Sequence, residues 1–323
     1  MKFTNFLIAL TATVLSTSNA NAQTYPATYP AKPVRLIVGF PSGGGTDTLA
    51  RVLSRKLGDS WPQPLVIENR AGADGAITAE IVAKAPADGY TLAMISNAHT
   101  ITPFLRKLAY YPVRDFAPVT IVASNPNLLL MHPSLPVANV KQLVALARAR
   151  PNELIFGSSG SGTSPYLAME LLKSMTDMQL VHVPYKGSSP AVIDLMGGHI
   201  QLMFGAVSTG LPHLQSGRLR ALGISSLQRT NALPQIPTIA ESGVPGFEVI
   251  GWFGILAPAN TQPAIVAKLQ TDIAAAISAP EIHKHLTDNG YSPVLNKPQA
   301  FGDVIRIDMA RWGKLIRSLE PQK

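Results

Sequence analysis

Two loops rich in glycine and hydroxyl residues are the parts of this sequence best suited to chemistry. The first covers residues 39–47, GFPSGGGTD, between an apolar run and a helix-like stretch. Glycines let backbone N–H groups approach a ligand, and a helix start attracts anions through its free N–H groups and its dipole. A capped turn does not need three adjacent glycines, so we interpret the segment as a ligand loop. Its candidate binding residues are Phe40, Ser42, Gly43, Gly44, Gly45, Thr46 and Asp47.

The second loop covers residues 157–165, GSSGSGTSP. Proline suits the first position of a helix, so the sequence predicts that Pro165 begins a helix and that Ser164 is its N-cap. In the first loop, Thr46 or Asp47 is expected to play the same capping role. Hydroxyls and N–H groups of the second loop could hold a carboxylate or a phosphate. Its candidate binding residues are Ser158, Gly162, Thr163 and Ser164.

Two further loops also join a strand-like run to a helix-like run. In residues 183–190, Ser189 is expected to cap a helix that Pro190 begins. Lys186 could supply positive charge there, although a lone lysine in a loop is more often solvated. The small residues of 204–208 fit either the wall of a pocket or plain packing.

The common enzymatic templates fail. Residues 157–162 do not spell G-x-S-x-G, and the glycines at 43–45 form neither G-x-G-x-x-G nor a P-loop. His283 and His285 are two residues apart, which places them on different faces of a helix. His182 and His199 are expected to satisfy local hydrogen bonds. Because nothing presents a nucleophile beside a base, the sequence favours binding over catalysis.

The elements that must position these loops alternate along the chain. Strand-like runs at 34–38, 65–67 and 91–95 are separated by helix-like runs at 46–57 and 77–84, which is typical of a parallel sheet covered by helices. The same alternation continues to the C-terminus. Further strands are expected at 119–123, 128–131, 154–156, 181–183, 200–204, 219–224 and 249–257, and further helices at 140–150, from 164 to about 175, up to 197, at 262–278 and at 298–318.

Composition and the first residues indicate an exported protein with a large core. Lys2, an apolar run at 6–15 and the Ala20-Asn21-Ala22 site predict a signal peptide of residues 1–22, cleaved after Ala22. The apolar run is too short for a membrane span, which needs ~20 residues. The 323-residue chain is 46% hydrophobic with a formal charge of +8 and no cysteine, so disulfides and thiol chemistry are excluded. The basic residues are scattered, which argues against a nucleic-acid partner.

Several short motifs follow one another along the chain. They are 29–35 (YPAKPVR) with 38–41 (VGFP), 68–73 (ENRAGA), 87–92 (ADGYTL), 182–187 (HVPYKG) with 190–191, 212–214 (PHL) with 217–222 (GRLRAL), 237–238, 245–247 (PGF) and 252–254 (WFG). In this order they resemble the substrate-binding components of tripartite tricarboxylate transporters, the Bug family of extracytoplasmic solute receptors. The resemblance extends over essentially the whole mature chain.

This resemblance implies an α/β, two-domain periplasmic-binding-protein fold of the Venus flytrap, type II-like kind, with two crossover strands. Domain 1 would comprise residues 23–124 plus 250–323, and domain 2 residues 125–249. The chain would cross between domains near residues 122–130 and 249–256. The resemblance also implies ligand contacts from the two glycine loops and from two more places. The contacts added in this way are Ser96, Asn97, Gly205 and Ala206.

The chain departs from the family pattern at three places. It has Gly72-Ala73-Asp74-Gly75 where the family often has Gly-Ala-Gly-Gly, and it has Gln201 and Gly205 where relatives often carry aspartate. An aspartate in the pocket wall would suit a ligand amino group, whereas Gly205 would leave space. These differences favour an aliphatic dicarboxylate, a tricarboxylate or an aromatic acid over an amino acid.

The leading hypothesis is a monomeric periplasmic receptor that performs no chemistry, needs no metal or cofactor, and delivers a small organic carboxylate to the membrane permease subunits. One alternative is a receptor with the same pocket that feeds a signalling sensor. A less favoured alternative is a secreted hydrolase or isomerase that uses the cleft.

Overall fold

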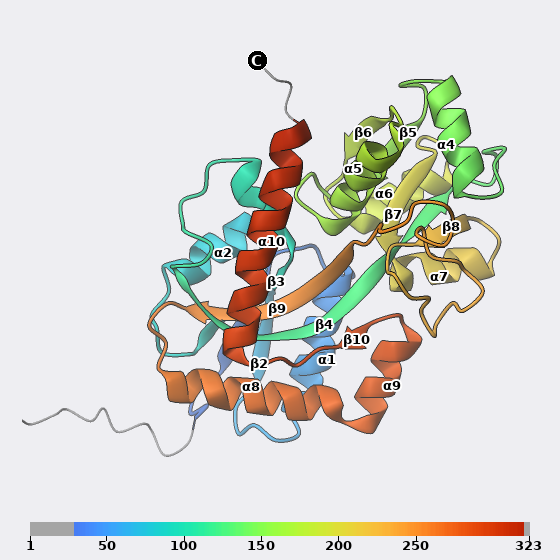
Figure 1. The fold of residues 1–323 in the computed structure, drawn as a ribbon. Coiled ribbons are helices and arrows are strands. Elements are labelled where there is room, and N and C mark those ends of the chain that lie inside the picture. Colours follow the sequence, from blue (N-terminus) through green and yellow to red (C-terminus); the bar gives the residue numbers. More distant parts are fainter. Residues whose placement is uncertain (1–28, 320–323) are drawn as a thin grey trace, which may run out of the picture.

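A computed structural model describes residues 29–319 of the chain; the predicted signal peptide lies outside this range. The structure is a mixed α/β fold of ten strands in one curled sheet, in the order β2-β1-β3-β9-β4-β7-β5-β6, with β10 and β8 also paired to β4. Figure 1 shows two lobes joined by the long strands β4 and β9. No helix between residues 29 and 319 is both long and apolar enough to cross a membrane.

The first half of the molecule is built on β2, β1, β3, β9 and the beginning of β4. Its strands β1, β2 and β3 run parallel because each is connected to the next through a helix. The side chains of β3 are all buried, as expected for a strand covered on both faces. The elements are β1 (Val34–Val38), α1 (Gly45–Leu57), β2 (Leu65–Asn69), the 3-10 turn η1 (Ala73–Gly75), α2 (Ala76–Ala83), β3 (Thr91–Ser96), α3 (Ala98–Ile101) and the 3-10 turn η2 (Thr102–Phe104).

Two antiparallel strands connect the halves. The sequence predicted separate strands at 119–123 and 128–131, interrupted by Asn125-Pro126, but the structure has a single strand β4 (Phe116–Met131). Its first part pairs with β9 (Ile250–Pro258) up to the Pro126–Ile250 pair, and its last part pairs with β7 and β8. The chain therefore leaves and re-enters the first half along two paired strands.

The second half is built on the end of β4 with β8 on one side and β7, β5 and β6 on the other. Its strands β5, β6 and β7 are parallel to one another. The elements are α4 (Val140–Ala149), β5 (Ile155–Ser158), α5 (Ser164–Thr176), β6 (Val181–Pro184), α6 (Ser188–Met196), β7 (Leu202–Ala206), α7 (Val207–Gln215) and β8 (Arg220–Ile224).

The C-terminal segment returns to the first half. Helix α8 (Pro263–Ser278) packs against α1 and β4, and α10 (Pro298–Leu319) packs against α3 and β4. Between them lie α9 (Pro280–Asp288) and the short strand β10 (Ser292–Pro293). Trp312 and Ile316 of α10 belong to the same apolar cluster as Leu143 and Phe156 of the second half. Arg311 of α10 also donates to Glu248 O of the second half, so the last helix contacts both halves.

Candidate functional site

A cavity of about 160 Å³ lies between the two halves. This is below the ~300–1,000 Å³ of pockets for drug-sized ligands, so the size suits a small molecule. Both halves contribute to its wall. The lining residues are Phe40, Pro41, Ser42, Gly44, Gly45, Thr46, Ser96, Asn97, Asn125, Asn127, Ser159, Thr163, Ser164, Pro165, Lys186, Gly187, Ser188, Ser189, Pro190, Ala206, Thr209, Gly251 and Phe253.

Four helices begin at this cavity. They are α1 of the first half and α5, α6 and α7 of the second, each with residues of its first turn or N-cap in the lining. None of the four N-cap side chains accepts a hydrogen bond from its own helix. The first N–H groups of a helix lack intrahelical partners and carry the positive end of the helix dipole. The cavity is therefore bounded by four groups of donors suited to an anion.

The caps differ from those that the sequence predicted. Helix α1 begins one residue before Thr46 and has Gly44 as its N-cap, helix α5 has Thr163 rather than Ser164, and helix α6 has Gly187 rather than Ser189. In each case the hydroxyl residue expected to cap the helix lies inside the first turn. Because glycine has no side chain to fold back, the caps of α1 and α6 leave the helix ends open to the cavity.

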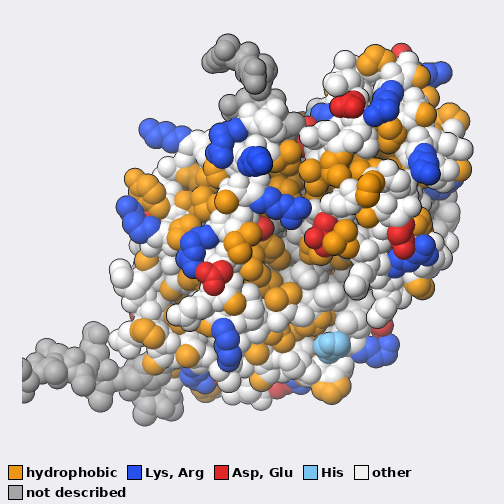
Figure 2. Space-filling view, viewed as in Figure 1, with side chains coloured by type: hydrophobic (Ala, Val, Ile, Leu, Met, Phe, Trp, Pro, Cys, Tyr) orange, Lys and Arg blue, Asp and Glu red, His pale blue; other side chains and the backbone are white. Residues whose placement is uncertain are grey.

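Among the residues of the described chain that line the cavity, Lys186 is the only charged side chain, and no acidic group reaches the wall. The overall charge of +8 does not produce a single basic stripe, because basic side chains are spread over the face shown in Figure 2. The preference for an anion is therefore local to the cavity. It follows from the helix starts and one lysine.

Asn97 lines this cavity and has an unused side-chain donor. The residue is 2% exposed, and its Nδ2 atom is buried with no hydrogen-bond partner within the described residues. A buried polar group without a partner costs ~1–3 kcal/mol, so a ligand oxygen that reached this atom would supply the missing partner. Apolar periodicity and glycine density did not identify Asn97 as a binding residue, because it is one polar residue that follows a buried strand.

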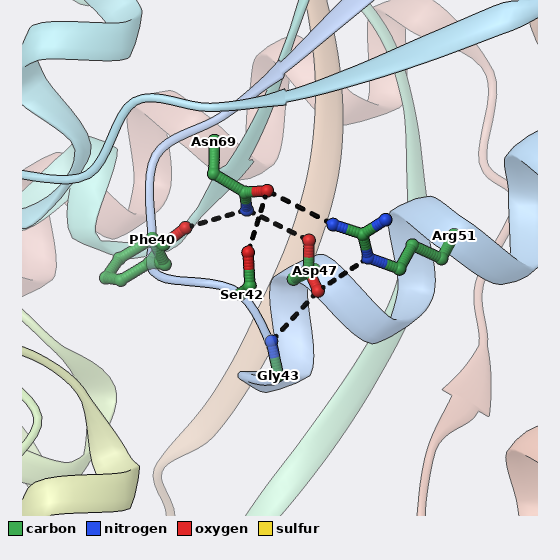
Figure 3. Close-up of polar contacts among 6 residues, drawn as sticks. All are labelled: Phe40, Ser42, Gly43, Asp47, Arg51 and Asn69. Atoms are coloured by element: carbon green, nitrogen blue, oxygen red, sulfur yellow. Dashed lines mark hydrogen bonds and ion pairs between the residues drawn. The ribbon is translucent and has the colours of Figure 1, made fainter.

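Asp47 fixes the first glycine loop through hydrogen bonds, and its side chain does not line the cavity (Figure 3). Its Oδ2 accepts hydrogen bonds from Gly43 N and from Arg51 Nε, both at 2.9 Å, and its Oδ1 accepts one from Asn69 Nδ2 at 2.9 Å. Asn69 Nδ2 also donates to Phe40 O. Burial acts to raise the pKa of Asp47, but the bonds from Arg51, Gly43 and Asn69 outweigh it and lower the pKa. The carboxylate therefore stays ionised and fixes the loop.

The second glycine loop is held by a hydrogen-bonded pair, the buried Ser158 and the partly buried His182. Ser158 Oγ lies 2.7 Å from His182 Nε2 and also accepts a hydrogen bond from Gly160 N. Burial, together with the nearby Lys173 charge, lowers the pKa of His182 to about 4. Ser158 is completely buried and does not line the cavity, so a ligand there cannot reach this hydroxyl. The pair stabilises the loop and is not placed to act as a nucleophile and base.

Thr163 and Ser164, at the start of α5, use their hydroxyl groups in different hydrogen bonds. Thr163 Oγ1 donates to Gly160 O at 2.7 Å, so its proton is already used. Ser164 Oγ accepts from Asn127 Nδ2 at 2.5 Å, which leaves its own proton available. Of the two hydroxyls, only that of Ser164 can donate to an anion without breaking a bond inside the protein.

The structure brings ten of the fifteen predicted binding residues to the cavity wall. Those ten are Phe40, Ser42, Gly44, Gly45, Thr46, Ser96, Asn97, Thr163, Ser164 and Ala206. The other five lie outside the wall: Gly43, Asp47, Ser158, Gly162 and Gly205. A Cβ at Gly205 would lie 3.3 Å from Leu130 Cδ1 and Met203 Cε, so this glycine faces packed side chains and leaves no space in the cavity.

Gln201, which also replaces an aspartate common in the family, lies outside the cavity wall as well. Its Oε1 atom accepts a hydrogen bond from Ile155 N at 2.9 Å. The prediction that Gly205 enlarges the pocket is therefore wrong for this chain. Gly205 and Gln201 give no reason to exclude an amino acid as the ligand.

Several lining residues were missed by sequence reasoning. Asn125 and Asn127 come from β4, Thr209 from α7, and Gly251 and Phe253 from β9. They lie on the connecting strands or one turn into a helix, outside the glycine- and hydroxyl-rich loops that the sequence marks as ligand loops. Residues 186–190 belong to a loop that the sequence did identify. Within residues 29–319, no cluster of three or more His, Cys, Asp or Glu side chains could hold a metal ion.

A family model described as "Tripartite tricarboxylate transporter family receptor" matches residues 49–320. Among curated relatives, a UPF0065 protein in the tcbD-tcbE intergenic region of Pseudomonas sp. strain P51 is 39% identical over 312 residues, which cover 96% of this chain and 93% of that protein. Protein BugT of Bordetella pertussis is 36% identical over 314 residues, which cover 96% of both.

Solved structures show the same likeness. An R. palustris protein solved with adipate is 40% identical with a TM-score of 0.86, and the match covers 90% of this chain and 97% of the other. MatC from Rhodopseudomonas palustris with bound malate is 31% identical with a TM-score of 0.83, and the match covers 89% and 100%. The periplasmic binding protein BugD is 30% identical with a TM-score of 0.84 over 90% and 98%. These likenesses agree with a two-domain, type II-like solute-binding fold.

Proposed function

The chain belongs to the tripartite tricarboxylate transporter receptor family, and we propose that it is an extracytoplasmic receptor that binds a small organic carboxylate between its two halves. The family is one of solute receptors rather than enzymes. The Ser158–His182 pair gives no support to a hydrolase, because Ser158 is buried and does not line the cavity. The observation that carries the proposal is the cavity onto which four uncapped helix starts open, with one lysine and no acidic side chain.

Each part of the wall has a role in this proposal. First-turn N–H groups of α1 lie in one half and those of α5, α6 and α7 in the other, so carboxylate oxygens can be bound from both sides. An exposed helix start contributes ~0.3–1 kcal/mol toward an anion, and more when it is buried. Asn97 Nδ2 and the Ser164 hydroxyl supply side-chain donors. Closure of the halves would then replace the water around the anion by these fixed donors.

The ligand class is a dicarboxylate, a tricarboxylate or an aromatic acid, and an aliphatic dicarboxylate is best supported. Donors from both halves suit an anion with a carboxylate at more than one end. Phe40, Pro41 and Phe253 add apolar surface that suits a carbon chain between them. Adipate and malate in the two solved relatives belong to the same class.

The remaining parts of the proposal concern the setting of the receptor. We infer that the chain is exported to the periplasm, is cleaved after Ala22, acts as a monomer and delivers its ligand to the permease subunits of the transporter. The proposed domain limits are residues 23–124 plus 250–323 and residues 125–249. They are supported by the change of β4 partner between Pro126 and Asn127.

The test combines ligand identification with variants of the wall. Mass spectrometry of small molecules released from the purified protein should find a carboxylic acid, and calorimetry with adipate and malate should detect binding. Asn97→Asp places a like charge against the anion, a juxtaposition that costs several kcal/mol, so binding should fall at least about 100-fold. Lys186→Gln should weaken it about two- to fivefold, because the lysine is exposed.

Lys284→Gln is the matched control, because Lys284 is an exposed lysine of α9 outside the cavity and should leave affinity unchanged. Unaltered affinity in Asn97→Asp would refute the assignment of this cavity as the anion site. Turnover of the bound acid would instead refute the receptor role.

A further inference from the structure

Asp74 reaches from the first half of the molecule into the second glycine loop. It lies in the turn η1, and its side chain is only 10% exposed. A Cβ built on Gly160 would overlap Asp74 Oδ1, and one on Gly162 would lie 3.2 Å from both Asp74 Cβ and Oδ2. The carboxylate therefore occupies space that these two glycines leave open.

The carboxylate is held on both sides. Arg106 Nη2 donates to Asp74 Oδ2 at 2.9 Å from within the first half. The backbone amide of Gly162 faces the same carboxylate from the second half. Burial raises the pKa of Asp74, while Arg106 and the Gly162 amide act to lower it. The contact therefore combines a close fit to two glycines with an oxygen acceptor that faces the Gly162 amide.

Other contacts between the halves are also made at glycines. A Cβ on Gly290 would lie 2.5 Å from Val207 Cβ, and one on Gly187 would lie 3.7 Å from Pro41. Tyr291 OH lies 3.2 Å from Ser208 Oγ. Asp74 differs from these contacts because it inserts a polar side chain directly into the loop that forms the start of α5.

We propose that Asp74 is a positioning residue that holds residues 157–164 of the second half against the first half, and so keeps the cavity closed. Its effect on ligand affinity rests on the proposed function, whereas its effect on the loop does not. Because the contact exists only when the halves are together, losing it would shift the population toward an open state.

The backbone conformation of Asp74 allows a variant that removes its side chain alone. Asp74 has φ 57° and ψ 33°, a left-handed conformation that glycine adopts more easily than aspartate. Asp74→Gly therefore removes the side chain without adding strain. Asp74→Asn keeps the shape and an acceptor oxygen. Asp59→Gly removes an exposed, lysine-paired carboxylate at the far end of α1 and serves as the control.

The first experiment is hydrogen exchange of the ligand-free protein at residues 157–164. Asp74→Gly should speed exchange there about tenfold, the effect of losing one hydrogen bond to a charged group. Asp74→Asn should stay within about threefold of the parent, and Asp59→Gly should match it. Equal protection in Asp74→Gly and the parent would overturn the proposal.

The second experiment is calorimetry with adipate. Asp74→Gly should raise the dissociation constant about tenfold, and Asp74→Asn should recover most of the parent affinity. Unchanged affinity in Asp74→Gly would overturn the role in closure. If neither the parent nor any variant bound a carboxylate, the proposed function would fail, while the exchange result would still decide the role of Asp74 in the loop.

Discussion

Ser164 and Thr163 are adjacent, but only Ser164 retains a hydroxyl proton for an anion. Ser164→Ala should therefore weaken carboxylate binding by ~1.5–3 kcal/mol, the range for a hydrogen bond to a charged group. Thr163→Ala removes the bond to Gly160 O and should mainly cost folding stability, by about 1 kcal/mol. Calorimetry and urea unfolding separate the two effects. Equal affinities of Ser164→Ala and the parent would mean that the Ser164 hydroxyl serves only Asn127.

The buried His99 and the partly buried His182 should make the fold less stable in mild acid. Burial lowers the pKa of both His99 and His182 to about 4, from an ordinary value near 6.5. Between these values the unfolded chain binds the proton and the folded chain does not, so stability falls as pH decreases from about 6.5 toward 4. Each histidine contributes a slope of up to ~1.4 kcal/mol per pH unit. Urea unfolding at several pH values should show a shallower slope in His182→Gln, and an unchanged slope would contradict the assignment.

The residues of the site also show where sequence reasoning reached its limit. Glycine density and hydroxyl spacing identified both ligand loops, because these signals are local. The same signals could not separate Gly44 and Gly45, which line the cavity, from Gly43, whose N–H is bound by Asp47. Asn125 and Asn127 were missed because only the pairing of β4 with strands distant in sequence brings them to the wall.

At the scale of elements, helix α10 packs closely against β9 because Gly254 has no side chain. A Cβ on Gly254 would overlap the ring of Phe301, which is completely buried in α10. Gly254→Ala should therefore destabilise the protein by ~1–3 kcal/mol through overpacking. Gly302→Ala in the same helix meets only ordinary contacts at 3.7 Å and should be stabilising by ~0.5–1 kcal/mol, because alanine favours helix over glycine. Denaturant unfolding should give opposite signs, and matching effects would contradict this account of the interface.

Most helices and strands were predictable within a few residues, because apolar periodicity and turn residues mark them. One exception was β4, where Asn125-Pro126 indicated a break, and α9 and β10 were not predicted as elements. A proline lacks a donor and normally interrupts a central strand. Here it stands where β4 finishes its pairing with β9 and begins its pairing with β7 and β8, so the missing donor falls at the change of partner. The short helix α3 was also missed, because four residues are too few to show a period.

At the scale of the whole molecule, a ligand bound between the halves should stabilise the native state by mass action. At a free concentration a hundred times the dissociation constant, the gain is ~2.7 kcal/mol and the melting temperature should rise. A bound carboxylate that left the melting temperature unchanged would contradict binding to the native state.

The pairing of Pro126 with Ile250 has a consequence for protein engineering. The segment that forms the second half begins and ends at two neighbouring points in space, Pro126 and Ile250. It could therefore be exchanged as one piece between relatives. A chimaera joined at these two residues would keep both junctions in one strand pair. The graft would also need its matching Trp312 and Ile316, because these side chains of α10 belong to the apolar cluster that continues into the transplanted half. Specificity could then be recombined by swapping one continuous segment together with the end of one helix.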